Sequence, residues 1–281
     1  MKQHIEPPKG LTQEIMHAHM SRAAEEIRHY TTIFVIPQKG AKGIPVSGIF
    51  VNTCGYFGIL TAHHVAKPVL ENPTFGLCIA EKVHEKWLES KHFQHVPIGF
   101  IPGKPYDENG PDLSFIIIRD PNLLATLKSL KSFSYLDKKD LEYFESPLDR
   151  MNWQITGSPN EASQLVSVSP VDGPLVKYES FVGDAIFDSR TERDGFDYLK
   201  LRVPYGEHNF PKDYEGVSGG GMWLIPFSAE SDDVNTIRYE APILAGINFY
   251  QSDIVNNERI ITGHGYNSIY SRVRQTLREL K

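Results

Sequence analysis

The chain is poor in three features that often mark the class of a protein: cysteine, clustered positive charge and long apolar runs. Its 281 residues include only two cysteines, Cys54 and Cys78. A small secreted protein held together by disulfides would carry more of them, so we expect two free thiols and a cytoplasmic location. The first ten residues, MKQHIEPPKG, lack the apolar segment of a secretory signal.

Charge and hydropathy exclude two further classes of partner. Lysine and arginine together number 29 against 35 acidic residues, and they form no cluster of the kind that holds nucleic acid. The longest apolar runs, such as residues 115–118, are far too short to cross a bilayer. We therefore expect neither a nucleic-acid partner nor a membrane partner.

The order of residue types along the chain predicts two β-rich regions between two helices. Residues 11–30 are rich in alanine and place apolar side chains at multiples of four, which favours a helix capped by Thr12. Short β-branched and aromatic runs broken by glycine and proline follow, which is typical of barrels or sandwiches. The chain ends in a second helical pattern, YSRVRQTLREL.

These changes in character divide the chain into four parts. Residues 1–30 form an N-terminal helical extension, residues 31–120 a first β-domain, residues 121–148 a charged and more helical connector, and residues 149–281 a second β-domain with the terminal helix. The length is enough for one large core or two smaller ones. The predicted fold class is all-β with a helix at each end.

A glycine-rich stretch, EGVSGGGMW, surrounds Ser218. Glycine loses more backbone freedom on folding than any other residue, so four glycines around one serine need a reason. A serine hydroxyl is a weak nucleophile that needs a neighbouring base, and the attacked carbonyl needs N–H donors for its developing charge. The N–H groups of Gly216 and Ser218 are candidates for these donors, and a plain glycine turn between strands is the alternative.

Two adjacent histidines, His63 and His64, follow the apolar residues of ILTAHHV. On a strand they would point to opposite faces, and the plain interpretation is one packed histidine and one at the surface. Metal binding is the alternative, but no third ligand lies at a usual spacing. The nearby HEKWL has Leu88 where the zinc motif H-E-x-x-H needs histidine, so we expect no metal site.

An aspartate, Asp112, stands directly before a strongly apolar strand predicted at Leu113–Ile118. A carboxylate at the entrance of a buried strand needs a partner, whereas a turn aspartate after Gly110–Pro111 is the plain interpretation. Asp107 and Asp120 are the fallback candidates for an acid in this region.

Taken in order, these motifs resemble those of the chymotrypsin/trypsin-like serine protease family in its bacterial form. The family carries histidine in L-T-A-x-H-[VC], aspartate in D-[LIV]-[AS]-L and serine in G-x-S-G-G, which stand here as LTAHHV, DLSF and GVSGGG. QITGSP, ILAGINFY and SIYSRV are similar to strands of the family's second barrel, so the likeness covers roughly residues 30–280. It implies two antiparallel six-stranded β-barrels with the site in the cleft between them, and the activity of a serine endopeptidase.

The resemblance also implies a role for each residue. Ser218 attacks the peptide carbonyl, His64 takes its proton and returns it to the leaving group, and Asp112 orients His64. The N–H groups of Gly216 and Ser218 form the oxyanion hole, and His63 occupies a variable position without a catalytic role. This chemistry needs no cofactor and no metal, and its partner is a protein or peptide substrate.

Three residues depart from the family pattern. Val217 replaces the aspartate of GDSGG, which in zymogen-activated members pairs with a new N-terminal ammonium, so we expect no activation by N-terminal trimming. Val65 replaces a cysteine, which excludes the family's nearby disulfide and agrees with a cytoplasmic location. Gly221 replaces the usual proline of SGGP, a change that we expect to be tolerated.

The residue preference of the primary pocket does not follow from the resemblance. In glutamate-specific relatives a histidine occupies the position that Asn248 matches, and here an amide replaces it. Lys212 near the pocket base would favour an acidic side chain, with an exposed loop lysine as an equal alternative. The residues that the alignment assigns to the pocket are Lys212, Asn248, Phe249, Tyr250 and Ser268.

Two other functions stay open at this point. A trypsin-like barrel without activity would serve as a binding or scaffold module, although all three triad positions are filled. GVSGG also fits the G-x-S-x-G elbow of an esterase-type α/β-hydrolase, and Asp253 and His264 follow it in the order of that fold. That elbow lies between a strand and a helix, whereas GMWLIPF has the pattern of a strand.

The N-terminal helix has a structural and a functional interpretation. We expect it to pack against the barrels, and the alternative is a docking site for a regulatory protein or for self-association. A cytoplasmic protease without a zymogen switch needs some other restraint, but no residue of the sequence identifies one.

Overall fold

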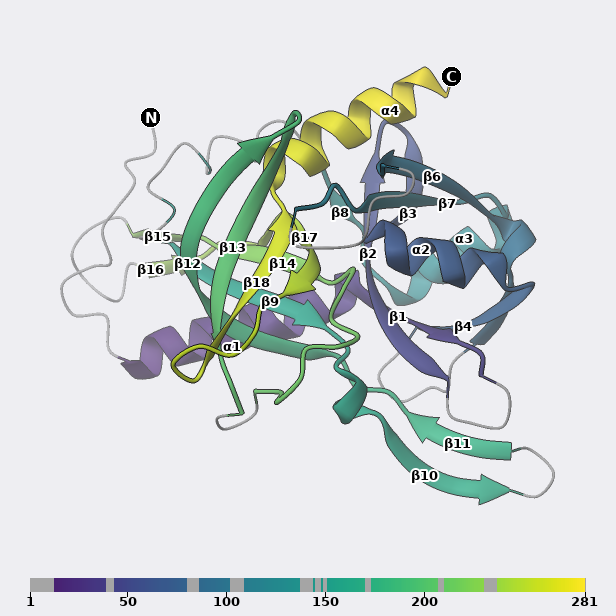
Figure 1. Ribbon diagram of the computed structural model, residues 1–281, viewed down its shortest axis with the longest axis horizontal. Coiled ribbons are helices and arrows are strands. Elements are labelled where there is room, and N and C mark those ends of the chain that lie inside the picture. Colours follow the sequence, from purple (N-terminus) through teal and green to yellow (C-terminus); the bar gives the residue numbers. More distant parts are fainter. Residues whose placement is uncertain are drawn as a thin grey trace.

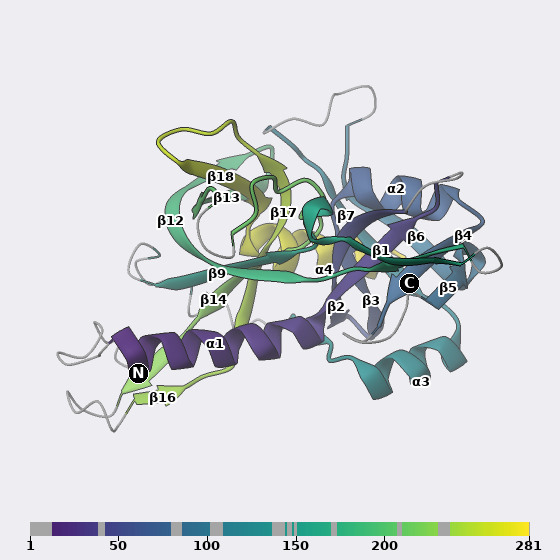
Figure 2. The same cartoon turned by 90° about the horizontal axis from the view of Figure 1, so that it is seen from below.

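The computed structural model describes residues 13–38, 43–79, 86–101, 109–136, 144, 148, 151–169, 173–206, 210–229 and 237–280. An open, curled sheet from the first half of the chain lies beside a closed barrel from the second half (Figure 1). Helix α1 (Gln13–Tyr30) and helix α4 (Val273–Glu279) lie on opposite sides of the junction between them (Figures 1 and 2).

The second β-rich region forms a closed antiparallel barrel of six strands, as the resemblance implies. In order around the barrel the strands are β12 (Phe181–Arg193), β13 (Phe196–Pro204), β18 (Glu258–His264), β17 (Ile243–Gln251), β14 (Gly221–Ile225) and β9 (Asn152–Gly157). Alternation of side chains explains why these segments are strands. Along β13, Leu199, Leu201 and Val203 are fully buried, and the half-exposed Lys200 and Arg202 alternate with them.

The first β-rich region differs from the closed barrel that the resemblance implies. Its strands form an open path in the described residues, and a short eighth strand, β8 (Ser134–Tyr135), pairs in parallel with β2. The path runs β5 (Lys86–Glu89), β4 (Thr74–Cys78), β1 (Thr31–Ile36), β2 (Ile44–Thr53), β3 (Tyr56–Thr61), β7 (Leu113–Ile118) and β6 (Phe93–Gly99). The edge strands β5 and β6 follow each other through the 3-10 turn Ser90–His92, and no pairing joins them in the described residues.

Strand β7 has the same bounds as the strand predicted from the sequence, and every one of its residues is buried. Phe115 and Ile117 belong to a core that they share with the barrel, whereas Ile116 and Ile118 belong to a second core on the other face. A strand buried on both faces is a continuous apolar run rather than an alternating one. Asp112 is therefore held at the entrance of the best-buried strand of the sheet.

The helices pack on the outside of this β-structure. Met20, Ala23 and Ile27 of α1 enter the shared core, which confirms that the N-terminal helix packs against both halves; residues 11 and 12 lie outside the described residues. Asp120 caps the N-terminus of helix α3 (Pro121–Leu130), and its carboxylate accepts the N–H groups of Asn122 and Leu123 in the first turn. No helix in the described part of the chain is long and apolar enough to cross a membrane.

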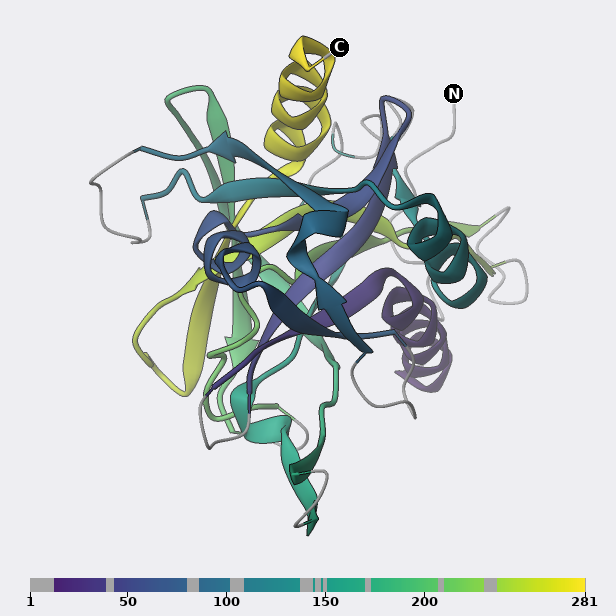
Figure 3. The same cartoon turned by 90° about the vertical axis from the view of Figure 1, so that its right-hand side faces the viewer.

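Two small ribbons extend the barrel. Strands β10 (Gln164–Ser169) and β11 (Gly173–Lys177) form a hairpin that projects from the body of the molecule (Figures 1 and 3). Strands β15 (Phe227–Ala229) and β16 (Ile237–Tyr239) form the second ribbon, which lies beside the N-terminal half of α1 (Figures 1 and 2). No residue of either ribbon is among those that line the cavity described below.

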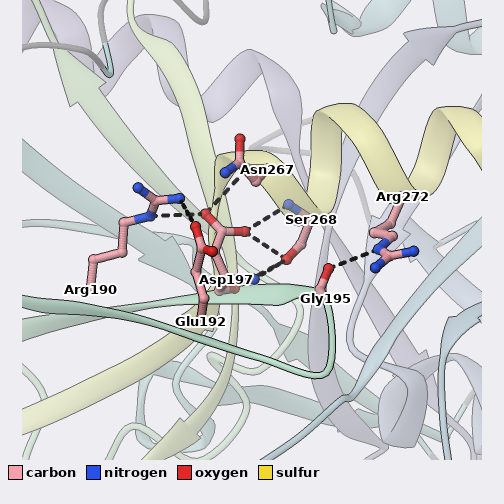
Figure 4. Close-up of polar contacts among 7 residues, drawn as sticks. All are labelled: Arg190, Glu192, Gly195, Asp197, Asn267, Ser268 and Arg272. Atoms are coloured by element: carbon pink, nitrogen blue, oxygen red, sulfur yellow. Dashed lines mark hydrogen bonds and ion pairs between the residues drawn. The ribbon is translucent and has the colours of Figure 1, made fainter.

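The prediction that SIYSRV is a strand is wrong. Ser268–Arg272 is a π-helical segment that continues into α4, and β18 is the last strand of the barrel. The Asp197 carboxylate accepts the N–H groups of Asn267 and Ser268 at 3.2 and 2.7 Å, and also the Ser268 hydroxyl (Figure 4). Because a carboxylate at this position satisfies the unpaired N–H groups of a helix start, it stabilises a helical turn over an extended strand.

Candidate active site

The two histidines begin helix α2 (His63–Glu71), and the strand expected to carry them, β3, ends two residues earlier. The backbone N–H of His64 donates to Asp112 Oδ1 at 2.9 Å, and His64 Nδ1 donates to Asp112 Oδ2 at 2.5 Å. One carboxylate therefore satisfies an N–H group of the first helical turn and at the same time fixes the imidazole of the same residue.

The surroundings of this pair suit a base held by a buried acid. Asp112 is 2% exposed, whereas the side chain of His64 is 27% exposed and so remains accessible from the cavity. The positive end of the α2 dipole favours the anionic carboxylate. Because Asp112 accepts the Nδ1–H, Nε2 is the nitrogen of the neutral imidazole that can take up a proton.

His63 is turned away into the sheet. Its Nδ1 lies 2.9 Å from Ser114 Oγ, which also lies 2.9 Å from His95 Nε2, and its ring stacks on Phe100. Burial, together with the neighbouring His95, lowers the pKa of His63 to about 4. His63 is thus a packed, neutral histidine, and it is not among the residues that line the cavity.

The turn around Ser218 requires glycine at two positions. Gly216 has φ of 92° and Gly219 has φ of 88°, in the left-handed region that other residues rarely adopt. A Cβ atom on Gly219 would overlap the backbone oxygen of Ser47 and the hydroxyl of Thr61. The glycines therefore bring Ser218 close to the sheet, and the turn is shaped rather than slack.

The N–H groups of this turn divide into two sets. Val217 N–H donates to Tyr214 O at 3.0 Å, Gly219 N–H to Asn248 O at 2.8 Å, and Gly220 N–H to Val217 O at 2.9 Å. The N–H groups of Gly216 and Ser218 have no acceptor in the part of the chain that the structure describes. The two groups that the resemblance assigns to the oxyanion hole are the two that the turn leaves unused.

Ser218 and His64 line the same cavity, which has a volume of about 310 Å³. The Ser218 hydroxyl donates to Phe249 O at 3.4 Å. A hydrogen bond of this length is weak, so little free energy is lost when the hydroxyl rotates to another acceptor. The lining residues are Ile44, Pro45, Val46, His64, Val65, Asn160, Tyr214, Glu215, Gly216, Val217, Ser218, Asn248, Phe249, Tyr250, Gln251 and Ile261.

Of the five residues assigned to the primary pocket, Asn248, Phe249 and Tyr250 line this cavity and Lys212 and Ser268 do not. The backbone N–H of Lys212 donates to Glu161 Oε1 at 2.7 Å, and its side chain is exposed. Ser268 is fully buried against Asp197 because its segment is helical (Figure 4). The alignment therefore groups with the lining residues two that lie outside this cavity.

The cavity also has a lining residue that the sequence did not indicate, Gln251. Gln251 Oε1 accepts the N–H of Tyr214 at 3.1 Å, and its Nε2 donates to Asp213 Oδ1 at 2.9 Å. Tyr214 is 2% exposed and donates its hydroxyl to Pro204 O at 2.9 Å. These bonds join β17 to the segment before Ser218, and no sequence pattern marks them, because each partner is a common polar residue.

The segment after Ser218 does not suit the esterase-type interpretation. Strand β14 comes next, where the elbow of an α/β-hydrolase needs a helix. Asp253 is exposed in the turn after β17, whereas His264 is fully buried. Among the fallback acids, Asp120 caps α3, and Asp107 lies outside the described residues.

Neither cysteine is among the residues that line this cavity. Cys54 and Cys78 are both free thiols, as the sequence predicts. No group of three or more histidine, cysteine or acidic side chains in the described ranges could hold a metal ion.

No protein-family model matches the chain, and no curated protein sequence matches it. The closed barrel and the curled half-barrel beside it are compatible with a trypsin-like double barrel. The functional interpretation therefore rests on the geometry of the site.

Proposed function

We propose that the chain is a trypsin-like serine endopeptidase that cleaves protein or peptide bonds through an acyl-enzyme. The observation that carries the proposal is the 2.5 Å hydrogen bond from His64 Nδ1 to the buried Asp112, made by a histidine that shares its cavity with Ser218. A serine, a base and a group that orients the base are the three parts that activate a hydroxyl nucleophile.

The reaction begins with attack by Ser218 Oγ on the carbonyl carbon of the scissile peptide bond. As the C–O bond forms, the hydroxyl proton passes to Nε2 of His64, and Asp112 stabilises the imidazolium. The C–N bond then breaks, and His64 gives the proton to the leaving amine, which yields the acyl-enzyme. Water attacks the ester with His64 as base again, which releases the acid and restores Ser218.

Negative charge that develops on the carbonyl oxygen needs donors that are already in place. The unused N–H groups of Gly216 and Ser218 are suited to this role, because the turn that carries them is fixed by the bonds of Val217, Gly219 and Gly220. Removing a single donor of this kind costs an enzyme roughly 100- to 1,000-fold in rate.

The turn holds its shape without the buried ion pair of zymogen-activated relatives. Val217 is 2% exposed, belongs to the shared apolar core and packs against Gly157, where any Cβ atom would meet its backbone. We infer that the turn takes its shape without an ion pair to a new N-terminus.

Labelling with a fluorophosphonate probe tests the proposal. Wild type is expected to become labelled at one residue, Ser218→Ala to lose all labelling, and His64→Ala to lose nearly all of it. His63→Ala is the matched control, because that histidine lies outside the cavity, and it is expected to keep labelling. Absence of labelling in wild type, or loss only in the His63 variant, would contradict the proposal.

A catalytically silent barrel that binds a protein partner is the second candidate. The observation that favours it is the hydrogen bond of the Ser218 hydroxyl, which reaches the carbonyl of Phe249 at 3.4 Å. A folded wild type that binds peptides but never reacts with the probe would support this candidate.

A further inference from the structure

His264 lies directly behind the candidate triad, at the end of strand β18. It is fully buried, and its backbone pairs with Tyr198 of β13 and with Ile247 of β17, so that it stands in the wall of the barrel. Its Nε2 accepts a hydrogen bond from the backbone N–H of Asp112 at 2.8 Å. The imidazole of a barrel residue is thus hydrogen-bonded to the backbone of Asp112, which belongs to the sheet.

The protonation of His264 follows from its partner. A backbone N–H can only donate, so Nε2 must carry no proton, and the neutral ring has its proton on Nδ1. Nδ1 is buried and has no partner in the described residues. A buried polar atom left without a bond is costly, so the hydrogen bond of Nε2 is the favourable polar contact that offsets this cost.

The same ring also contacts the strand that accepts the Ser218 hydroxyl. The centroids of His264 and Phe249 lie 4.9 Å apart, and the carbonyl of Phe249 accepts the hydrogen bond from Ser218. Tyr198 packs on the ring from β13 with the centroids 5.2 Å apart, which leaves the imidazole little freedom to turn. Burial, opposed by the nearby Asp112, lowers the pKa of His264 to about 4, so the ring stays neutral at ordinary pH.

We propose that His264 is a positioning residue that anchors Asp112 of the sheet to the barrel that carries Ser218. Asp112 and His64 come from one β-structure and Ser218 from the other, so their mutual geometry depends on the junction between the two. His264 fixes the backbone of Asp112 at this junction and packs against Phe249 beside Ser218. The effect of His264 on catalysis rests on the function proposed above, whereas its anchoring of Asp112 does not.

Two substitutions distinguish the effect of the Nε2 acceptor from the effect of the volume of the ring. His264→Gln keeps an acceptor at about the position of Nε2, whereas His264→Met has similar volume and no oxygen or nitrogen acceptor. His264→Asn, whose amide is too short to reach Asp112, replaces the Met variant if that one does not fold. Val203→Ala in the barrel core is the control for general loosening, because Val203 is fully buried and is not among the residues that line the cavity.

The first readout is the proton resonance of the His64 Nδ1–H group, which a short, charge-assisted hydrogen bond moves far downfield of the amide protons. It is assigned by its absence in His64→Ala. We expect it to persist in His264→Gln and Val203→Ala and to be lost or displaced upfield in His264→Met. Persistence in the Met variant, or equal loss in Val203→Ala, would overturn the proposal.

The second readout is the rate of fluorophosphonate labelling. We expect a fall of at least about tenfold in His264→Met, because a displacement of about 1 Å in a catalytic group costs up to about 100-fold. His264→Gln is expected to stay within about threefold of wild type, since the positioning bond is kept. A wild type that shows the resonance but no labelling would refute the proposed function and leave the anchoring role intact. Labelling that is equal in the Gln and Met variants would refute the anchoring role alone.

Discussion

The hydroxyl of Ser47 donates a 2.8 Å hydrogen bond to the carbonyl oxygen of Gly216. Ser47 lies on β2 of the sheet and is fully buried, and its Oγ in turn accepts the N–H of Ser158 from the barrel at 2.8 Å. Its backbone N–H also donates to Ser218 O at 3.2 Å. The carbonyl of Gly216 is therefore held toward the sheet by a residue from outside the turn.

Substitution of Ser47 by alanine is expected to loosen this turn. The change leaves the Gly216 carbonyl and the Ser158 N–H without their partner, which costs about 1–3 kcal/mol for a buried polar group. We expect a lower free energy of unfolding in urea titrations and about tenfold slower fluorophosphonate labelling, because the N–H groups of Gly216 and Ser218, the proposed oxyanion donors, lose their fixed direction. The exposed Ser129→Ala is the control, and labelling of Ser47→Ala at the wild-type rate would contradict the role of Ser47.

Introducing an aspartate at position 217 is expected to destabilise the protein. Val217 is 2% exposed and belongs to the apolar core. A carboxylate at this position would therefore be buried among apolar side chains. Loss of about 3–5 kcal/mol of unfolding free energy is expected for Val217→Asp, on the scale of an uncompensated buried charge. The isosteric Val217→Thr should lose less. A Val217→Asp variant as stable as wild type would show that a buried partner exists.

Some motifs could be predicted from the sequence because their own residues determine the local backbone conformation or burial. Ser218 is flanked by glycines that the left-handed backbone and the close approach of Ser47 require, and Asp112 precedes a strand buried on both faces. His64 follows a strand as predicted, although it lies in a helix whose first turn Asp112 caps. In each case the local sequence contains the cause of the local structure.

Residues whose role depends on distant partners could not be predicted in this way. Ser47 is 169 residues from Gly216, and His264 is 152 residues from Asp112. The helical form of Ser268–Arg272 depends on Asp197, which lies 71 residues before Ser268. A pattern of β-branched and aromatic residues predicts a strand there, and a single capping carboxylate reverses the outcome. Closure of the first sheet likewise depends on whether its two edge strands pair, which periodicity does not determine.

Stability is expected to fall as the pH is lowered from about 6.5 to about 4. The pKa of His63 and that of His264 are both lowered to about 4, from an ordinary value of 6.5, so the unfolded chain binds protons first in this range. Their contribution is fully present above pH 6.5 and is lost as the pH falls toward 4, by up to about 3 kcal/mol for each histidine, because one pKa unit corresponds to 1.36 kcal/mol.

Urea unfolding at pH 7.5 and at pH 4.5 measures this dependence. Carboxylates titrate in the same range, so the difference between variants is the informative quantity. His63→Gln and His264→Gln should each reduce the change in unfolding free energy between the two pH values, because the glutamine side chain does not titrate. The exposed His17→Gln is the matched control and should leave the change as in wild type. Equal pH dependence in all four proteins would contradict the buried, neutral state of the two histidines.

The residue preference of the cavity is expected to depend on Gln251 and not on Lys212. Gln251 joins Tyr214 and Asp213 across the wall of the cavity, whereas Lys212 is exposed and outside it. Gln251→Glu places a carboxylate beside Asp213, and like charges at this distance repel, so the segment before Ser218 should move away from β17. If the proposed activity holds, cleavage of a peptide library by Gln251→Glu should show a broader preference at the residue before the cut, with a raised KM. Lys212→Ala should leave the preference as in wild type, and a loss of acidic residues from the cleaved set in that variant would return Lys212 to the pocket.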